Sequence, residues 1–362
     1  MPAEWEPHAA TWLAWPHHRA DWPGKFEPIP WVYAEIIRHL TKHERVELIV
    51  NDAAFARQAR KVLERADAFS SNIRFHHWPT NRVWLRDSGC IFLRRNPHAS
   101  KIAKRGAASV ALKFRFNAWA KYSNWRHDEK IGSLMSSVAR GEEIRLISKG
   151  ERVVLEGGSI DVNGAGSILT TEECLLSEVQ QRNPGLGDET TTQRLLETAF
   201  HDYLGIDQTL WLNRGCAGDD THGHIDDIAR FVPGADNQAN TILACVEPNT
   251  ADENHIPLAE NLDRLRSARN LHGPNKGKPF QIVELPMPAP VVFEGQRLPA
   301  SYANFYIANG LVLVPTFNDP QDRHALNIIA RCFPTREIIG IHAVDLVWGL
   351  GTLHCLSQQE PA

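Results

Sequence analysis

The segment "NFYIANGLVLVPTF", residues 304–317, consists of two apolar stretches joined by Asn309-Gly310. An Asn-Gly pair tolerates the positive φ angles of a tight β-hairpin, so we expect two antiparallel strands here. A similar segment, "SIDVNGAGSILTT" at residues 159–171, is expected to turn at Asn163-Gly164. In both segments a strand, an Asn-Gly turn and an apolar strand lead into threonine. This repetition indicates a fold assembled from similar modules.

Helical and strand patterns alternate around these hairpins. Apolar residues at helical spacing predict helices at 31–42, 52–65, 192–204, 257–268 and 320–332, the last starting at Asp319-Pro320. Short β-rich stretches predict strands at 46–50, 209–212, 241–246, 280–285 and 337–341. The pattern recurs at intervals of roughly 60 to 75 residues, which indicates about five modules. No linker divides them, so we expect a single α/β domain over residues 1–362.

The composition excludes several classes of protein. A net charge of -4 leaves no large basic surface, so we expect no nucleic-acid partner. No stretch approaches the roughly 20 apolar residues of a membrane span, and the first residues lack a signal-peptide pattern. We therefore expect no membrane partner and a cytoplasmic location. The 6 cysteines form no Cys-x-x-Cys pair, which argues against a disulfide framework or a zinc knuckle.

The stretch "GDDTHGHIDD", residues 218–227, combines histidines with carboxylates. Histidines at i and i+2 of an extended segment point the same way, so His222 and His224 can share a metal with Asp226. Alternatively, one histidine acts as a general base among carboxylates that bind a cation. A third possibility is a solvated acidic loop whose histidines bond locally. The residue types alone leave these three alternatives open.

Three other polar positions each have an ordinary explanation when taken singly. Asp87 in "VWLRDSG" can form a strand-end ion pair, and a buried cysteine such as Cys355 is more often packing than nucleophile. Glu156 in "VVLEGGSIDV" ends an apolar stretch, where a buried carboxylate is costly unless something pairs with it. If the modules converge around an axis, however, these groups suit a planar cation such as guanidinium. Carboxylates would grip it while sulfur attacks its carbon.

Several motifs, taken in order, resemble those of a known family. They are "MPAEWEPHAATWLAWP", "WLRDSG", "FNAWAKY", "LEGGSIDVNG", "THGHIDD", "LPASYANFYIANGLVLVPTFNDP" and "LHCLSQQEP". They are similar to motifs of agmatine deiminases and the related bacterial-type peptidyl-arginine deiminases, within the guanidino-group modifying superfamily. The resemblance covers nearly the whole chain. It implies an α/β fold in the form of a five-bladed propeller of pseudo-symmetric modules, the pentein fold.

The resemblance also implies roles for individual residues. Cys355 corresponds to the nucleophile, His224 to the general acid/base and Glu156 to its carboxylate partner, while Asp87 and Asp226 correspond to the guanidinium-binding carboxylates. The implied reaction hydrolyses a small cationic guanidino substrate to a ureido product and ammonia through a covalent cysteine thiouronium intermediate. It uses neither cofactor nor metal. Agmatine, converted to N-carbamoylputrescine in polyamine metabolism, is the implied substrate. Family members are commonly dimers, so a homodimer is possible.

The chain also departs from the family pattern. Arg82 stands where agmatine enzymes often carry an acidic residue, and an arginine near the substrate's far end would repel agmatine's ammonium. We therefore keep arginine or another guanidino acid as an alternative substrate, unless Arg82 pairs with Asp227 or another acid. Trp84 and Trp119 are expected to keep the pocket dry. A further departure, His222, replaces the Asp or Asn of many relatives.

Three other functions remain as alternatives. A metal-dependent hydrolase would use His222, His224 and Asp226. A non-catalytic relative would only bind guanidino compounds, although all five matched residues are retained. An amidinotransferase would be a nearer variant, in which an amine replaces water.

Overall fold

One strand order recurs through the computed structural model, which describes residues 1–94, 109–234 and 239–362. Five sheets each join an antiparallel pair to a parallel neighbour. Their strands, sheet by sheet, are β20 (Gln358–Pro361), β1 (His8–Ala14), β2 (Arg45–Val50) and β3 (Ile73–His77); β4 (Ile91–Arg94), β5 (Ser109–Leu112) and β6 (Glu142–Ile144); β9 (Asp161–Val162), β10 (Ser167–Thr171) and β11 (Gln208–Leu212); β12 (Ala229–Val232), β13 (Thr241–Val246) and β14 (Gln281–Pro286); and β17 (Tyr306–Ala308), β18 (Leu311–Thr316) and β19 (Glu337–His342). The repeated modules expected from the sequence are therefore present.

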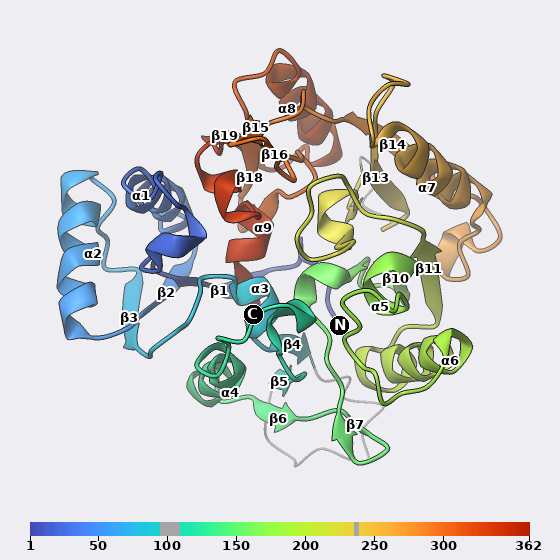
Figure 1. The fold of residues 1–362 in the computed structure, drawn as a ribbon, viewed down its shortest axis with the longest axis horizontal. Coiled ribbons are helices and arrows are strands. Elements are labelled where there is room, and N and C mark those ends of the chain that lie inside the picture. Colours follow the sequence, from blue (N-terminus) through green and yellow to red (C-terminus); the bar gives the residue numbers. More distant parts are fainter. Residues whose placement is uncertain (95–108, 235–238) are drawn as a thin grey trace.

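The longer helices connect the parallel strands, as crossover connections require. They are α1 (Ile29–Leu40), α2 (Ala53–Arg65), α4 (Asp128–Val138), α6 (Glu189–Ala199), α7 (His255–Ser267) and α8 (Gln321–Cys332). Figure 1 shows these helices around the periphery, whereas the short helices α3 (Leu85–Ser88) and α9 (Leu353–Leu356) lie nearer the middle. The mixed α/β class is thus confirmed. The five sheets do not join into one closed sheet within the described residues, and the propeller arrangement stays a prediction.

Short elements complete the described chain. They are the helix α5 (Glu172–Leu175), the strands β7 (Ile147–Ser148), β8 (Glu151–Arg152), β15 (Val292–Phe293) and β16 (Gln296–Arg297), the 3-10 turns η1 (Arg19–Asp21), η2 (Ala118–Ala120), η3 (Gly157–Ser159), η5 (Ile225–Asp227), η6 (Gly273–Asn275) and η7 (Leu346–Gly349), and the π-helical turn η4 (Phe200–Leu204). No helix in the described ranges is long and apolar enough to cross a membrane.

Both Asn-Gly hairpins form. β9 pairs with β10 and β17 with β18, each antiparallel. Only the glycine of each pair takes a positive φ, 70° at Gly164 and 75° at Gly310. The asparagine serves differently: Asn163 Oδ1 accepts hydrogen bonds from the backbone N–H groups of Ala165 and Ser167. Side-chain bonding to the turn therefore accompanies the conformational freedom that the sequence analysis relied on.

The five predicted helices and five predicted strands are present, with ends shifted by a few residues. The start of α8 differs slightly, because its N-cap position is Pro320 while Asp319 Oδ1 accepts from the N–H of Gln321 at 2.7 Å. Helix α4 was not predicted, since Gly132 and several serines interrupt its apolar period. That glycine has a packing reason: a Cβ there would lie 2.5 Å from Lys113 Cδ.

Candidate active site

The five residues matched to catalytic or guanidinium-binding roles come from four separate short segments. Asp87 lies on α3 and Cys355 on α9, while Glu156 immediately precedes η3, and His224 and Asp226 belong to the η5 turn. The segments α3 and α9, α3 and η3, and η3 and η5 contact one another. All five residues are at most 6% exposed. The structure therefore brings the predicted residues into one buried cluster.

His224 lies at the centre of the carboxylates. Its Nδ1 is 3.9 Å from Asp87 Oδ1 and 4.0 Å from Asp226 Oδ1, and its Nε2 is 3.8 Å from Glu156 Oε2. Neither ring nitrogen has a hydrogen-bond partner, although the side chain is fully buried. Burial opposes the charged imidazolium, but the facing carboxylates, Asp87 foremost, raise the pKa of His224 well above its usual value. The imidazole is therefore a proton donor at neutral pH.

Asp87 is fixed by two donors. Its Oδ2 accepts from Trp119 Nε1 at 2.9 Å, and its Oδ1 accepts from the backbone N–H of Gly158 at 3.0 Å. The glycine is required by the close approach, because a Cβ at Gly158 would lie 2.5 Å from His224 Nδ1. Burial, together with the charges of Glu156 and Asp226, raises the pKa of Asp87 to about 6, against the lowering effect of His224. The expected ion pair between Asp87 and its neighbour Arg86 does not form; Arg86 NH1 donates instead to Gln359.

Glu156 has a cationic partner that the sequence analysis did not identify. Arg182 Nε lies 3.2 Å from Glu156 Oε1, and both side chains are fully buried. Arg182 also donates to the carbonyl oxygens of Gln180, at 3.0 Å, and Thr221. Burial alone would raise the pKa of Glu156, but the guanidinium outweighs it and lowers the pKa to about 2. Glu156 is thus ionised, and its Oε2 stays unpartnered toward His224.

The Cys355 thiol contacts an amide and a carboxylate. Asn304 Nδ2 donates to the sulfur at 3.1 Å, and the sulfur is 3.7 Å from Asp226 Oδ2. Burial raises the pKa of Cys355 well above its usual value, and the charges of Asp226, Asp227 and Asp87 raise it further. The thiol is therefore protonated in the free protein, and a nearby cation is needed to favour the thiolate.

Asp226 is oriented by a histidine that the sequence analysis also missed. His354 Nδ1 lies 2.6 Å from Asp226 Oδ2, and its Nε2 lies 2.8 Å from Glu4 Oε2. Asp226 Oδ1 is left buried and without a partner. Burial works against ionisation, but the hydrogen bond from His354 leads the interactions that lower the pKa of Asp226. Adjacency of His354 to Cys355 was the only sequence signal for this residue.

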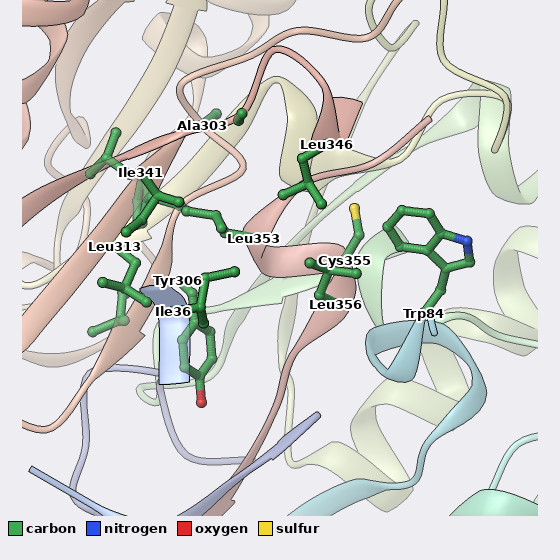
Figure 2. Packing of buried hydrophobic residues seen from close by; sticks show 14 of the residues in the cluster. Ile36, Trp84, Ala303, Tyr306, Leu313, Ile341, Leu346, Leu353, Cys355 and Leu356 are labelled. Carbon is green, nitrogen blue, oxygen red and sulfur yellow. The ribbon is translucent and has the colours of Figure 1, made fainter. Parts of the chain in front are cut away.

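A cavity of about 260 Å³ opens onto the cluster. Asp87, Cys355, Trp84 and Trp119 line it, and Figure 2 shows the Cys355 sulfur directed toward the Trp84 indole. Trp84 is 6% exposed and Trp119 5% exposed. Both indoles therefore contribute apolar wall beside the sulfur, as expected for a pocket that excludes water.

Arg82 also lines this cavity and is 7% exposed. Its Nε lies 3.6 Å from Asp21 Oδ1, and its NH1 donates to the Asn124 carbonyl oxygen at 2.9 Å. The partner is therefore an acid, as one alternative required, but it is Asp21. The named candidate Asp227 instead accepts from Asn304 Nδ2 at 2.9 Å.

The predicted placement of His222 and His224 on the same side is wrong. His222 has a φ of 63° and Gly223 a φ of 98°, so the segment is not extended. His222 Nε2 lies 3.3 Å from Ser177 Oγ and its Nδ1 lies 4.0 Å from Glu173 Oε1. In the described part of the chain, three potential metal ligands gather at Glu156, Cys174 and His224. That group omits His222 and Asp226, so the ligand set of the metal alternative does not assemble.

Fold and site together define an α/β protein whose buried thiol, imidazole and carboxylates meet at one cavity. The family model of the Porphyromonas-type peptidyl-arginine deiminases matches residues 1–361. A Legionella pneumophila relative named "Putative agmatine deiminase" is 33% identical over 367 residues, which cover 100% of this chain and 94% of the relative.

Two solved structures are similar over the full length. The agmatine deiminase of Enterococcus faecalis is 27% identical with a TM-score of 0.85, covering 100% of this chain and 95% of that one. The C. jejuni agmatine deiminase is 30% identical with a TM-score of 0.80, again covering 100% and 95%. The chain belongs to the Porphyromonas-type peptidyl-arginine deiminase family, which confirms the family recognised from its ordered motifs.

Proposed function

We propose that the protein is a guanidino-group deiminase that hydrolyses agmatine to N-carbamoylputrescine and ammonia. One observation carries this proposal: a thiol, an imidazole and three carboxylates converge in a buried cluster at a cavity, with polar atoms of His224, Glu156 and Asp226 left unpartnered. Buried polar groups are normally satisfied, so unpartnered atoms of opposite character suggest a ligand that completes them. The names of the relatives, agmatine deiminases, support the same reaction class.

Asp87 and Asp226 are the proposed guanidinium-binding groups. Both carboxylates are buried, so they hold a planar cation more strongly than exposed carboxylates would. Trp119 and Gly158 fix the first carboxylate, and His354 fixes the second. A guanidinium gripped by both is already oriented when the sulfur attacks its carbon.

The bound cation also prepares the nucleophile. It offsets the negative charges that raise the pKa of Cys355, so ionisation of the thiol becomes favourable when substrate binds. The thiolate adds to the guanidinium carbon and forms a carbon–sulfur bond. His224 donates its proton to one nitrogen, ammonia leaves, and an S-alkylthiouronium remains on Cys355.

Hydrolysis completes the cycle in the same site. Neutral His224 takes a proton from water, and the resulting hydroxide adds to the thiouronium carbon. Collapse of this adduct breaks the carbon–sulfur bond, releases the ureido product and regenerates the thiolate. Glu156, which lies 3.8 Å from His224 Nε2 and is ionised beside Arg182, stabilises the imidazolium in each half-reaction. Substrate, water and these side chains account for every atom transferred.

The wider setting follows from the same proposal. A carbamoylputrescine product places the enzyme in polyamine metabolism. We also propose that residues 1–362 form one catalytic domain whose five sheets are the blades of a five-bladed α/β propeller, and that two copies form a homodimer. The repeated strand order and the origin of the site residues in four segments support the propeller.

A panel of guanidino compounds assayed for ammonia release tests the reaction and its substrate. We expect turnover of agmatine to exceed that of arginine and other guanidino acids. Preference for arginine would establish the alternative substrate, and no ammonia from any compound would refute the proposal. Activity abolished by a chelator and restored by a divalent metal would favour a metal-dependent hydrolase instead.

A further inference from the structure

The far end of the cavity carries a second pair of opposite charges. Asp21, in η1, and Arg82 both line the cavity that Cys355 also lines. Their side chains are 9% and 8% exposed, respectively. Burying such a pair is costly unless each charge is compensated, so the partners of each atom decide what this end of the cavity can bind.

The two oxygens of Asp21 differ. Oδ1 lies 2.9 Å from His18 Nδ1 and 3.6 Å from Arg82 Nε. Oδ2 is buried and has no hydrogen-bond partner. Both neighbouring cationic groups therefore act on one oxygen, and the other remains an acceptor with nothing bound to it.

The other charged groups here are engaged. Arg82 NH1 donates to the Asn124 carbonyl oxygen, and its guanidinium lies 4.4 Å from the centre of the Tyr122 ring. Asp220, which also lines the cavity, pairs through Oδ1 with Lys121 and accepts from Tyr122 OH through Oδ2 at 2.7 Å. Among these groups, the atom that lacks a partner is a carboxylate oxygen, which calls for a donor from the ligand.

We propose that Asp21 is the specificity-determining residue that receives the ammonium at the substrate's far end. This rests on the proposed deiminase function and assigns the substrate class: guanidino compounds that end in a cation, with Arg82 held aside rather than available to a carboxylate. The arginine is then a positioning residue, because its contact with Oδ1 leaves Oδ2 for the substrate. Burial raises the pKa of Asp21, and an ammonium bound at Oδ2 would offset that cost.

Asp21→Asn tests this with two substrates of equal chain length, agmatine and butylguanidine, whose far end is a methyl group. We expect kcat/KM for agmatine to fall on the order of 30-fold or more, since a buried charge partner is lost. Turnover of butylguanidine should change less than about twofold, because it makes no bond to Oδ2. The ratio of the two values is internal to each variant, so partial misfolding does not imitate the effect.

Further variants complete the test. Asp21→Glu should recover part of the preference for agmatine, and Asp202→Asn, at an exposed aspartate that is 58% accessible, should not alter it. An equal loss for both substrates in Asp21→Asn would reduce Asp21 to a structural role and overturn the inference. So would a selective loss of arginine turnover in Arg82→Gln, which would make Arg82 a carboxylate receptor. If wild-type protein releases no ammonia from either substrate, the deiminase proposal itself fails.

Discussion

The inner and outer ends of the cavity solve the problem of buried charge in different ways. At the inner end, carboxylates outnumber cations around His224, and Asp226 Oδ1, Glu156 Oε2 and both ring nitrogens of His224 stay unpartnered. At the outer end, Asp21 faces Arg82 and Asp220 faces Lys121, with one unpartnered oxygen on Asp21. The inner end is therefore suited to react with a cation, and the outer end to discriminate between substrates.

Removing the sulfur should have the largest effect on this contrast. Cys355→Ser leaves a hydroxyl that does not ionise in this carboxylate-rich site, so we expect kcat to fall by about 10³-fold or more. Steady-state ammonia release from agmatine measures the change. Cys332→Ala, at a buried cysteine on α8, is the matched control and should retain activity. Comparable activity in Cys355→Ser and wild type would place the nucleophile elsewhere.

Neutralising one guanidinium-binding group at the inner end comes next. Asp87→Asn should lower kcat/KM by about 10²-fold, because a desolvated carboxylate no longer faces the cation. In the wild type the pKa of Asp87 is about 6, so the carboxylate is lost as pH falls through that value. The kcat/KM profile should therefore decline below about pH 6, and this limb should be absent in Asp87→Asn. An unchanged acid limb in the variant would assign the titration to another group.

Breaking the buried ion pair behind Glu156 should appear mainly in stability. Arg182→Gln leaves a buried carboxylate without its cation, for which we expect a loss of about 3–5 kcal/mol in the free energy of unfolding. The pKa of Glu156 is lowered to about 2 from an ordinary 4.5, so the pair stabilises the fold above pH 4.5 and progressively less toward pH 2. Urea unfolding at pH 7 and pH 4 should show the difference between variant and wild type shrinking at the lower pH.

The matched control for that experiment is an exposed ion pair. Arg60 Nε lies 2.8 Å from Glu64 Oε1, and these side chains are 56% and 50% exposed. Arg60→Gln should cost at most about 1 kcal/mol. Equal effects of the two arginine substitutions would mean that Arg182 contributes no more than a surface charge.

The smallest effect is expected at the residue that made the metal hypothesis attractive. His222 contacts Ser177 and Glu173 rather than the cluster, so His222→Asn should change kcat/KM by less than about twofold. Incubation with a chelator should leave activity unchanged in both proteins. A large loss in this variant, reversed by added zinc, would revive a metal role for His222.

The sequence was sufficient for the modules and for the five matched site residues, and physical reasons explain what it missed. Asn-Gly turns and amphipathic periods are local, so the hairpins and five of the longer helices could be predicted. Arg182 and Glu4 could not, because they meet Glu156 and His354 only through the tertiary fold. The requirement that buried Glu156 have a partner predicted that a cation exists, without indicating which one. His222 was misjudged because a left-handed φ at a non-glycine residue has no clear sequence signal.

The most direct test of the account is to isolate the proposed covalent intermediate. Wild-type protein is mixed with agmatine, quenched in acid within one turnover and examined by peptide mass spectrometry. We predict that the peptide bearing Cys355 carries an added mass equal to agmatine less ammonia, and that Cys355→Ser shows no adduct. Turnover without any adduct on Cys355 across the time course, or an adduct on another residue, would contradict nucleophilic catalysis by this sulfur.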